Sequence, residues 1–261
     1  MLSVDREEKA LVKIDDFVND MKEKTAGVLL EIAGRGERSE KRYRFQAGSA
    51  HIITVRGGAI EKAAITHLVL AGVKPPGANK ASDGVVYQME VFPENPHSPM
   101  GHFNLQWTTG ESNSYSMNLD LFPAVTVKED LAAMRGVMDG VADAFGRDRV
   151  EMRKGLDEHY NLPYWQSPLA AQVGCKLLSL GDDMVGLVTA AYRTFFDTYT
   201  GILKKRKDTP FSAEERELKL ERNGRWLEYI VFKDRAVKMA LAFGMPAEIL
   251  TGLSFPPSAA F

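Results

Sequence analysis

The sequence predicts an α+β fold, with a large antiparallel sheet flanked on both faces by helices in one domain over residues 1–261. Strand-like segments follow one another closely between residues 51 and 121. The short intervals leave no room for crossover helices, so antiparallel pairing is favoured. Helical patterns dominate from residue 126 onward, and this separation of strands from helices is typical of α+β proteins. A chain of 261 residues can also bury one large core without disulfides or structural metals.

The chain begins with a predicted amphipathic helix. Leu11, Ile14, Val18 and Met21 recur at intervals of three or four residues, which places them on one helical face opposite charged side chains. The segment 35–44 is polar and dense in charge, and it is predicted to be a connector.

Five strands are predicted next, each a short run bounded by turn residues. Gly57-Gly58 marks the turn after the first strand, because glycine readily adopts the backbone angles that tight turns need. The strand candidates are residues 51–55, 65–70, 85–91, 102–108 and 115–121.

The helical half is predicted to begin at Thr126. Thr126 and Glu129 have the spacing of a capping box, in which the hydroxyl and the carboxylate satisfy free backbone N–H groups. An apolar stripe follows at helical spacing and would face the core. It consists of Leu131, Met134, Met138, Val141 and Phe145.

The last third of the chain is predicted to hold two helices and two strands. A long helix covers residues 184–203. A second capping box, formed by Ser212 and Glu215, opens a charged helix that ends near Asn223. The two strands are residues 226–232 and 237–243, joined by a turn at Asp234-Arg235.

Composition and charge exclude several classes of protein. A formal net charge of −2 argues against general nucleic-acid binding, which requires a basic face. The one cysteine, Cys175, excludes an internal disulfide, and the five histidines show no paired spacing of a metal site. Residues 3–9 lack the apolar core of a signal peptide, and no apolar run approaches membrane-spanning length. The sequence therefore predicts a cytoplasmic protein with no metal and no membrane span.

The most informative stretch lies between Phe92 and Asp130. It opens with three prolines within seven positions, each of which fixes φ and biases the preceding residue away from helix. This predicts a stiff, extended corner that delivers His102 and Asn104 onto the following strand. Such a corner indicates a functional site rather than a linker.

Asp120 and His102 are the candidate catalytic residues of this stretch. Asp120 stands between Leu119 and Leu121, and apolar surroundings would raise the pKa of its carboxyl group, as suits a residue that takes or holds a proton. Spacing alone favours the simpler alternative of a turn aspartate bonded to the backbone. His102 also has two interpretations: an imidazole that relays protons near neutral pH, or a satisfied core residue on a strand.

Two motifs carry a resemblance to a known family. They are Asn95-Pro96-x-x-Pro99-x-x-His102-x-Asn104 and Asp120-Leu121-x-Pro123. Together they look like the core of oxygen-dependent coproporphyrinogen III oxidase. Further family-like segments follow the family's order, so the resemblance covers most of the chain. They lie at residues 61–63, 206–210, 224–229, 234–235 and 253–257.

The resemblance implies a fold, a reaction and an assembly. The family has a large antiparallel sheet sandwiched by helices, and its members form homodimers. They decarboxylate two propionates of a tetrapyrrole oxidatively to vinyl groups, using dioxygen as co-substrate and no metal or organic cofactor. Asp120 falls where the family carries its catalytic aspartate. His102 matches the family's histidine, with Asn104 as its positioning partner.

The resemblance also implies residues that bind the substrate's propionates. Gly58 belongs to a glycine turn whose backbone N–H groups can hold a carboxylate, although a simple hairpin turn explains the glycines equally well. Arg225 and Arg235, together with Arg222, are cations that could meet propionates. Ordinary ion pairs are the alternative for at least one of them.

Several family positions have changed. Gln106 stands where the family has an arginine, Gln88 where it has a serine, and Gly244-Met245-Pro246 where it has Gly-Gly-Arg. An arginine-bearing segment corresponds to residues 171–175, which contain none. Gln88, Gln106 and Asn104 are still predicted to contact substrate. Because glutamine cannot supply arginine's charge, a tetra-anionic substrate would lose at least about 1.5 kcal/mol per missing charged hydrogen bond.

The sequence thus supports two functional hypotheses. The first is a divergent coproporphyrinogen oxidase-like enzyme, cofactor-free and oxygen-dependent. It would act on a tetrapyrrole propionate or on an altered, less acidic substrate, because one scaffold can keep its chemistry while its substrate changes. The second is a non-catalytic tetrapyrrole-binding or chaperone protein on the same scaffold.

Overall fold

The computed structural model describes residues 14–73, 82–109, 113–242 and 244–261, so Leu11 and residues 3–9 lie outside the described part. The strands are β1 (Glu37–Phe45), β2 (Gly48–Gly57), β3 (Ile60–Val73), β4 (Ser82–Pro93), β5 (Met100–Thr109), β6 (Ser114–Phe122) and β7 (Cys175–Leu180). The α-helices are α1 (Ile14–Ala33), α2 (Lys128–Ala144), α3 (Leu156–Tyr160), α4 (Val185–Arg206), α5 (Ala213–Phe232), α6 (Arg235–Ala242) and α7 (Ala247–Leu253).

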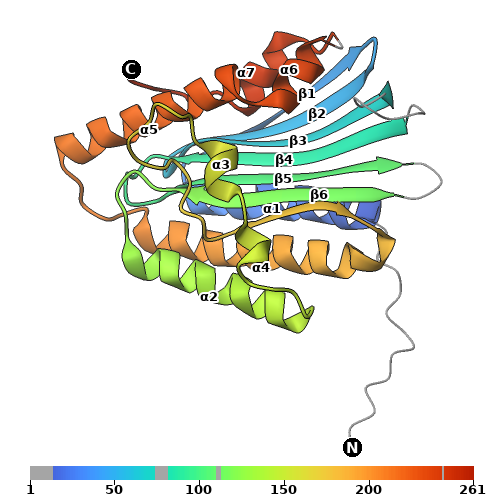
Figure 1. Ribbon diagram of the computed structural model, residues 1–261. Helices are drawn as coiled ribbons and strands as arrows, with labels where there is room; N and C mark the ends of the chain where they lie inside the picture. Colours follow the sequence, from blue (N-terminus) through green and yellow to red (C-terminus); the bar gives the residue numbers. More distant parts are fainter. Residues whose placement is uncertain (1–13, 74–81, 110–112, 243) are drawn as a thin grey trace, which may run out of the picture.

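The seven strands form one sheet in which chain neighbours are also spatial neighbours, from β1 at one edge to β7 at the other (Figure 1). Each neighbouring pair is antiparallel, which confirms the predicted fold class. Short connections permit this order, because antiparallel strands need only a hairpin between them. The register places Glu90, His102 and Asp120 side by side on β4, β5 and β6.

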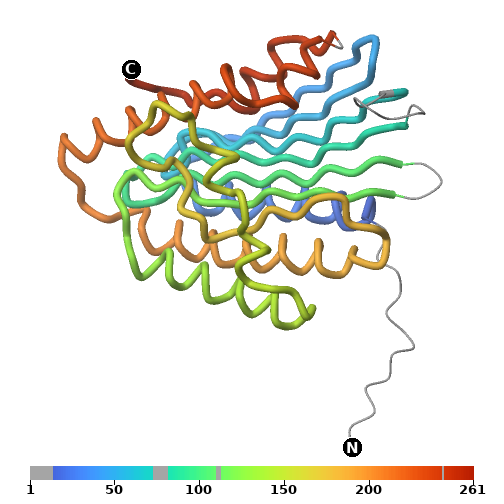
Figure 2. Tube along the Cα trace, viewed as in Figure 1, coloured from blue at the N-terminus to red at the C-terminus, as the bar shows by residue number. Residues whose placement is uncertain are grey.

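One face of the sheet carries the larger hydrophobic core. Its apolar residues pack against α1, α2 and α4, which lie on the same side of the sheet in Figures 1 and 2. Phe103 stands near the middle, with its ring centroid 5.0 Å from that of Phe195 and 5.6 Å from that of Tyr199. Burial of such side chains is worth about 1.5–3 kcal/mol each, so this face anchors the sheet.

The second face of the sheet is covered by α5, α6 and α7, with α3 beside them (Figure 1). Its apolar cluster includes Phe92, Phe122, Trp226 and Ile249. Polar residues of the middle strands interrupt this cluster, because β4, β5 and β6 carry them at every second position. The second face therefore combines burial with hydrogen-bonding capacity.

The proline-rich segment forms the corner between β4 and β5, as predicted. Asn95 fixes it on two sides, since its Oδ1 accepts the His97 N–H at 2.9 Å and its Nδ2 donates to the Thr209 carbonyl at 2.7 Å. The hydroxyl of Tyr199 donates to the Pro99 carbonyl at 3.0 Å. These bonds tie the corner to α4 and to the loop after it, and so fix where β5 begins.

The prediction of strands at 226–232 and 237–243 is wrong. Helix α5 continues from Ala213 to Phe232 instead of ending near Asn223, and α6 occupies Arg235–Ala242, while residue 243 lies outside the described part. Trp226, Tyr229 and Ile230 are buried at helical spacing, whereas Phe232 is exposed. Packing of one helical face against the sheet has overridden the strand preference of these aromatic and β-branched residues.

Both edge strands lie where the sequence predicts none. β1 occupies the predicted connector, and its mostly exposed, charged side chains give no alternation to recognise. It is held by pairing with β2 along its whole length. β7 is a six-residue strand that pairs with β6 and begins at Cys175, which is buried as predicted.

Only one of the two predicted capping boxes forms. The Ser212 hydroxyl accepts the Glu215 N–H at 3.2 Å, and the Glu215 carboxylate accepts the Ser212 N–H at 2.8 Å. Helix α2 begins after Val127, with no side-chain cap. Glu129 instead binds Arg206, so an ion pair between helices replaces the predicted local cap.

Replacing Arg206 by methionine is expected to lower the free energy of unfolding by about 2 kcal/mol. Its guanidinium donates to the buried Asp130 carboxylate at 2.6 and 3.1 Å. Removing Arg206 would leave the buried negative charge of Asp130 without its main partner. Lys205, 3.1 Å from Asp130, still pairs with this carboxylate and so reduces the loss of stability. Urea denaturation measures the change in the free energy of unfolding. The matched control is Lys204→Met, whose pair with Glu31 is exposed and should change stability by less than about 0.5 kcal/mol. Equal effects of both substitutions would contradict the prediction.

Candidate active site

A group of polar side chains lies side by side on the second face of the sheet. Strand register pairs Gln88 with Asn104, Glu90 with His102, and His102 with Asp120. Glu90 and Asp120 are fully buried, and His102 is 5% exposed. Burying ionisable groups is costly, so a cluster of this kind indicates a functional site.

Asp120 is held by the backbone of the segment that leads into β7. Its Oδ2 accepts the Gln172 N–H at 2.9 Å, and its Oδ1 accepts those of Val173 and Gly174 at 3.0 and 3.2 Å. Burial raises the pKa of Asp120 to about 6, and the N–H groups limit the rise by favouring the ionised form. Each sequence-based interpretation of Asp120 thus describes part of its environment, which is both desolvated and backbone-bonded.

His102 lies in an aromatic enclosure. Its ring centroid is 5.2 Å from that of Trp226, 5.6 Å from that of Tyr160 and 6.3 Å from that of Phe122. Its Nδ1 stands 3.6 Å from Oε1 of Glu90, beyond hydrogen-bond length, and has no hydrogen-bond partner among the described residues. Glu90 and His102 are therefore neighbours without a direct hydrogen bond.

Asn104 contacts a different residue from the one predicted. Its Nδ2 donates to Oε1 of Gln88 at 3.2 Å, so Gln88 and not His102 is its partner. Gln88 in turn donates to Oε1 of Glu90 at 2.7 Å, and the Ser254 hydroxyl donates to the same oxygen at 2.9 Å. Gln88, Asn104 and Glu90 therefore form one connected chain of hydrogen bonds.

A small cavity of about 90 Å³ lies between this face of the sheet and helices α6 and α7. Gln88, Asn104 and Gln106 line it from the sheet, so three predicted substrate-binding residues meet at one place. Most other lining residues are apolar. Asp234 is the one ionisable residue among the described lining residues. Asp120 and His102 are not part of this lining and lie deeper in the same face.

Two other predicted site residues lie away from the cavity. Gly58, with φ +58°, forms the turn between β2 and β3, where a side chain would collide with the Ala33 carbonyl at the end of α1. Arg235 is exposed at the start of α6. Neither lines the cavity, so the geometry does not bring them together with Gln88 and Asn104.

Arg222 and Arg225 line a separate cavity of about 400 Å³, bounded by the end of β6 and the loop before β7. Arg222 donates to the carbonyls of Pro168 and Leu169, at 3.0 and 2.5 Å, and Arg225 donates to the Ser167 hydroxyl at 2.9 Å. Burial, with Arg225 nearby, lowers the pKa of Arg222 to about 10. Both arginines therefore hold this loop, which continues to the N–H groups around Asp120.

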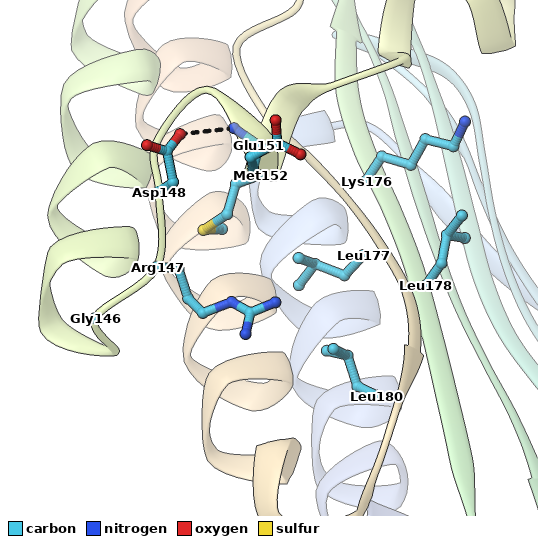
Figure 3. A pocket seen from close by; sticks show the side chains of 9 residues that line it. All are labelled: Gly146, Arg147, Asp148, Glu151, Met152, Lys176, Leu177, Leu178 and Leu180. Atoms are coloured by element: carbon cyan, nitrogen blue, oxygen red, sulfur yellow. Dashed lines mark hydrogen bonds between the residues drawn. The ribbon is translucent and has the colours of Figure 1, made fainter.

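A third hollow lies beside the edge strand β7 (Figure 3). It measures about 390 Å³ and separates the end of α2 from β7, with Arg147, Lys176 and Leu177 on its walls. Asp148 accepts the Glu151 N–H at 2.9 Å on its rim, as the dashed line in Figure 3 marks. None of the predicted site residues lines it.

Two buried charged residues near the site, Glu90 and Lys62, are not among the predicted site residues. Lys62 is fully buried, donates to the Thr251 and Phe255 carbonyls, and has its pKa lowered to about 8 by burial, a shift that the charge of Glu90 opposes. The signal for Glu90 is present in the sequence. Gln88 and Glu90 are polar at alternate positions of an otherwise apolar strand, so they share one face.

Within the described part of the chain, no three histidine, cysteine, aspartate or glutamate side chains are grouped so that they could hold a metal ion. No described helix combines the length and the apolar character that crossing a membrane requires.

A family model described as coproporphyrinogen III oxidase matches residues 13–261, nearly the whole chain. The match includes the proline-rich corner, the strands that carry His102 and Asp120, and the helices above the cavity. The chain therefore belongs to the coproporphyrinogen III oxidase family.

Proposed function

We propose that the protein is an oxygen-dependent, cofactor-free oxidase that acts on a tetrapyrrole or a related pyrrolic substrate with fewer carboxylates than coproporphyrinogen. The observation that carries this proposal is the buried polar group on the second face of the sheet. Glu90, His102 and Asp120 stand in register there, next to a cavity lined by Gln88, Asn104 and Gln106. Family membership supports an oxidation of this type.

The family reaction balances without a further co-reactant. Each propionate side chain, –CH₂–CH₂–COOH, loses its carboxyl carbon as carbon dioxide, the carboxyl proton, and one hydrogen from the methylene next to the pyrrole ring. A vinyl group, –CH=CH₂, remains. Dioxygen accepts the two electrons and two protons and leaves as hydrogen peroxide. Protein groups need only bind the substrate and move a proton, for which Asp120, with its pKa raised to about 6, and His102 are suited.

The charge of the cavity lining is the reason for proposing a substrate with fewer carboxylates. Among the described residues that line the cavity there is no lysine or arginine, so a carboxylate entering it would lose its hydration and meet no cation. The arginines Arg222 and Arg225 lie in a different cavity, beyond the loop that precedes β7. A substrate with fewer carboxylates avoids this cost.

A second candidate function is binding of a tetrapyrrole without turnover. Two observations favour it: three N–H groups already occupy the carboxylate of Asp120, and neither Asp120 nor His102 lines the cavity. A substrate could reach them only if the aromatic enclosure or the segment 172–174 moved.

Oxygen uptake with reduced tetrapyrroles tests the proposal. Coproporphyrinogen III, with four carboxylates, and mesoporphyrinogen IX, with two, are incubated in air with and without the protein. We expect oxygen consumption above the protein-free blank, faster with mesoporphyrinogen IX, and none under nitrogen. Mass spectrometry of the products detects any loss of carbon dioxide. Uptake equal to the blank for both compounds, with fluorescence titration showing binding, would replace the oxidase with the binding protein.

A further inference from the structure

The hydrogen bonds beneath the cavity run in one direction. Glu90 lies at one end, where its Oε1 accepts from Gln88 and from Ser254. Because Gln88 donates from its NH₂ group to Glu90, its carbonyl oxygen is turned toward Asn104. That oxygen accepts the Nδ2–H of Asn104 at 3.2 Å. The carbonyl oxygen of Asn104 is thus left at the far end of the chain.

This far end is an unpaired acceptor. Oδ1 of Asn104 is buried and has no hydrogen-bond partner among the described residues, although Asn104 lines the cavity. Thr66 lies on β3, the strand that pairs with β4, and lines the same cavity. Its hydroxyl oxygen is also buried, and no described residue bonds to it. A buried acceptor left without a donor costs about 1–3 kcal/mol, which an N–H group of a ligand would recover.

Asp234, the one ionisable residue among the described lining residues, also disfavours anions. Oδ1 of Asp234 accepts the N–H groups of Ala236 and Val237, at 2.8 and 3.1 Å, at the start of α6. Burial raises the pKa of Asp234, yet in neither protonation state does it bring positive charge to the cavity. Lys62 lies in the same layer as Glu90 but outside the lining, and its ammonium group is directed at the carbonyls of Thr251 and Phe255.

We propose that Glu90 determines the specificity of the cavity. By fixing the sense of the Gln88–Asn104 chain, it makes the cavity select an uncharged ligand group that donates hydrogen bonds, and reject a carboxylate. The inference rests on the proposed function, because it takes this cavity as part of the substrate site. It assigns an N–H-bearing part of the substrate to the cavity and places the substrate's carboxylates outside it.

A matched pair of small ligands tests this selectivity. Pyrrole-2-carboxamide and pyrrole-2-carboxylate share one ring and differ in charge and in hydrogen-bond donors. Each is titrated into the wild-type protein, and the side-chain amide signals of Gln88 and Asn104 are followed by NMR. We expect the carboxamide to shift these signals and to bind at least tenfold more tightly than the carboxylate, a difference of about 1.4 kcal/mol.

Three variants examine the cause of the preference. Gln at position 90 can donate as well as accept, so in Glu90→Gln the chain can reverse, and the preference should fall below threefold. Glu61→Gln is the matched control, because Glu61 is not among the described lining residues and pairs with Lys219 at 2.7 Å, so this variant should keep the wild-type preference. Gln106→Arg adds a cation to the lining and should make the carboxylate the tighter ligand.

Several outcomes would overturn the inference. They are carboxylate binding to the wild type as tight as carboxamide binding, no carboxamide binding at all, or an unchanged preference in a folded Glu90→Gln protein. If the Glu90→Gln protein does not fold, the inference is still tested by the relative affinities of the carboxamide and the carboxylate for the wild type and for Gln106→Arg. These measurements need no turnover. A failure to consume oxygen would refute the proposed oxidase, whereas the selectivity of the cavity is judged by binding alone.

Discussion

Replacing Asp120 by asparagine is expected to reduce any turnover by at least about 100-fold, the usual size of a lost general acid or base. Asparagine keeps the shape of the side chain, but it cannot take up a proton. Its NH₂ group would also face N–H groups of the segment 172–174, where Asp120 presents two acceptor oxygens. Oxygen uptake at saturating substrate measures the loss, and a variant with wild-type turnover would exclude Asp120 from the reaction.

The same substitution has a second readout that needs no substrate. The carboxyl group of Asp120 has a pKa of about 6 in the folded protein, against 3.8 as its ordinary value, so folding disfavours the ionised form. The contribution of protonated Asp120 to the free energy of unfolding is fully present below pH 3.8 and is lost as the pH rises through 6. The stability of the wild type relative to Asp120→Asn should therefore fall by about 2.4 kcal/mol between pH 4 and pH 7.

Asp130→Asn serves as the control with the opposite sign. Arg206 and Lys205 bond to Asp130, and its pKa is lowered although burial acts against this. Its stabilising effect is therefore present at neutral pH and is lost as the pH falls through its folded pKa. Urea unfolding of the wild type and both variants is compared from pH 2 to pH 7, because the Asp130 effect is lost only below the ordinary pKa of 3.8. If the stability difference between the wild type and Asp120→Asn does not vary with pH, Asp120 has an ordinary pKa.

Gly174→Ala is expected to be the most damaging small substitution near the site, with a loss of about 3 kcal/mol or more in the free energy of unfolding. A methyl group at Gly174 would stand 1.9 Å from the Leu119 carbonyl oxygen and 3.0 Å from the ring of Phe195. The first contact is with backbone, which cannot rotate away, so β6 and the segment leading into β7 must separate. That movement also withdraws the N–H of Gly174 from Asp120.

Gly140→Ala is the matched control for this prediction. Gly140 lies within α2, and a methyl group there meets nothing within 4 Å. Alanine is the better helix former by about 1 kcal/mol, so the control should be neutral or stabilising. Thermal and urea unfolding of both variants measures the contrast. A Gly174→Ala protein as stable as the wild type would show that the backbone around Asp120 tolerates displacement.

The surroundings of Asp120 show which features of the site can be predicted from neighbouring residues in the sequence. Its apolar neighbours predict burial, and burial is observed. The three N–H groups that hold it come from residues 172–174, more than fifty positions away, and no local pattern identifies them. Likewise, the strand preference of 226–232 is overridden because Trp226 and Tyr229 pack together above Phe122, a contact that exists only in the folded chain.

The sequence by itself determined the fold class, the family and the positions of the middle strands, because alternation, turn residues and motif spacing are local properties that can be read along the chain. Only the tertiary structure decided which polar groups share a cavity. Gln88, Asn104 and Gln106 meet there, whereas Gly58, Arg225 and Arg235 lie elsewhere. The physical reason is that strand register and helix packing set distances between residues remote in the chain, and hydrogen bonding at a site depends on those distances.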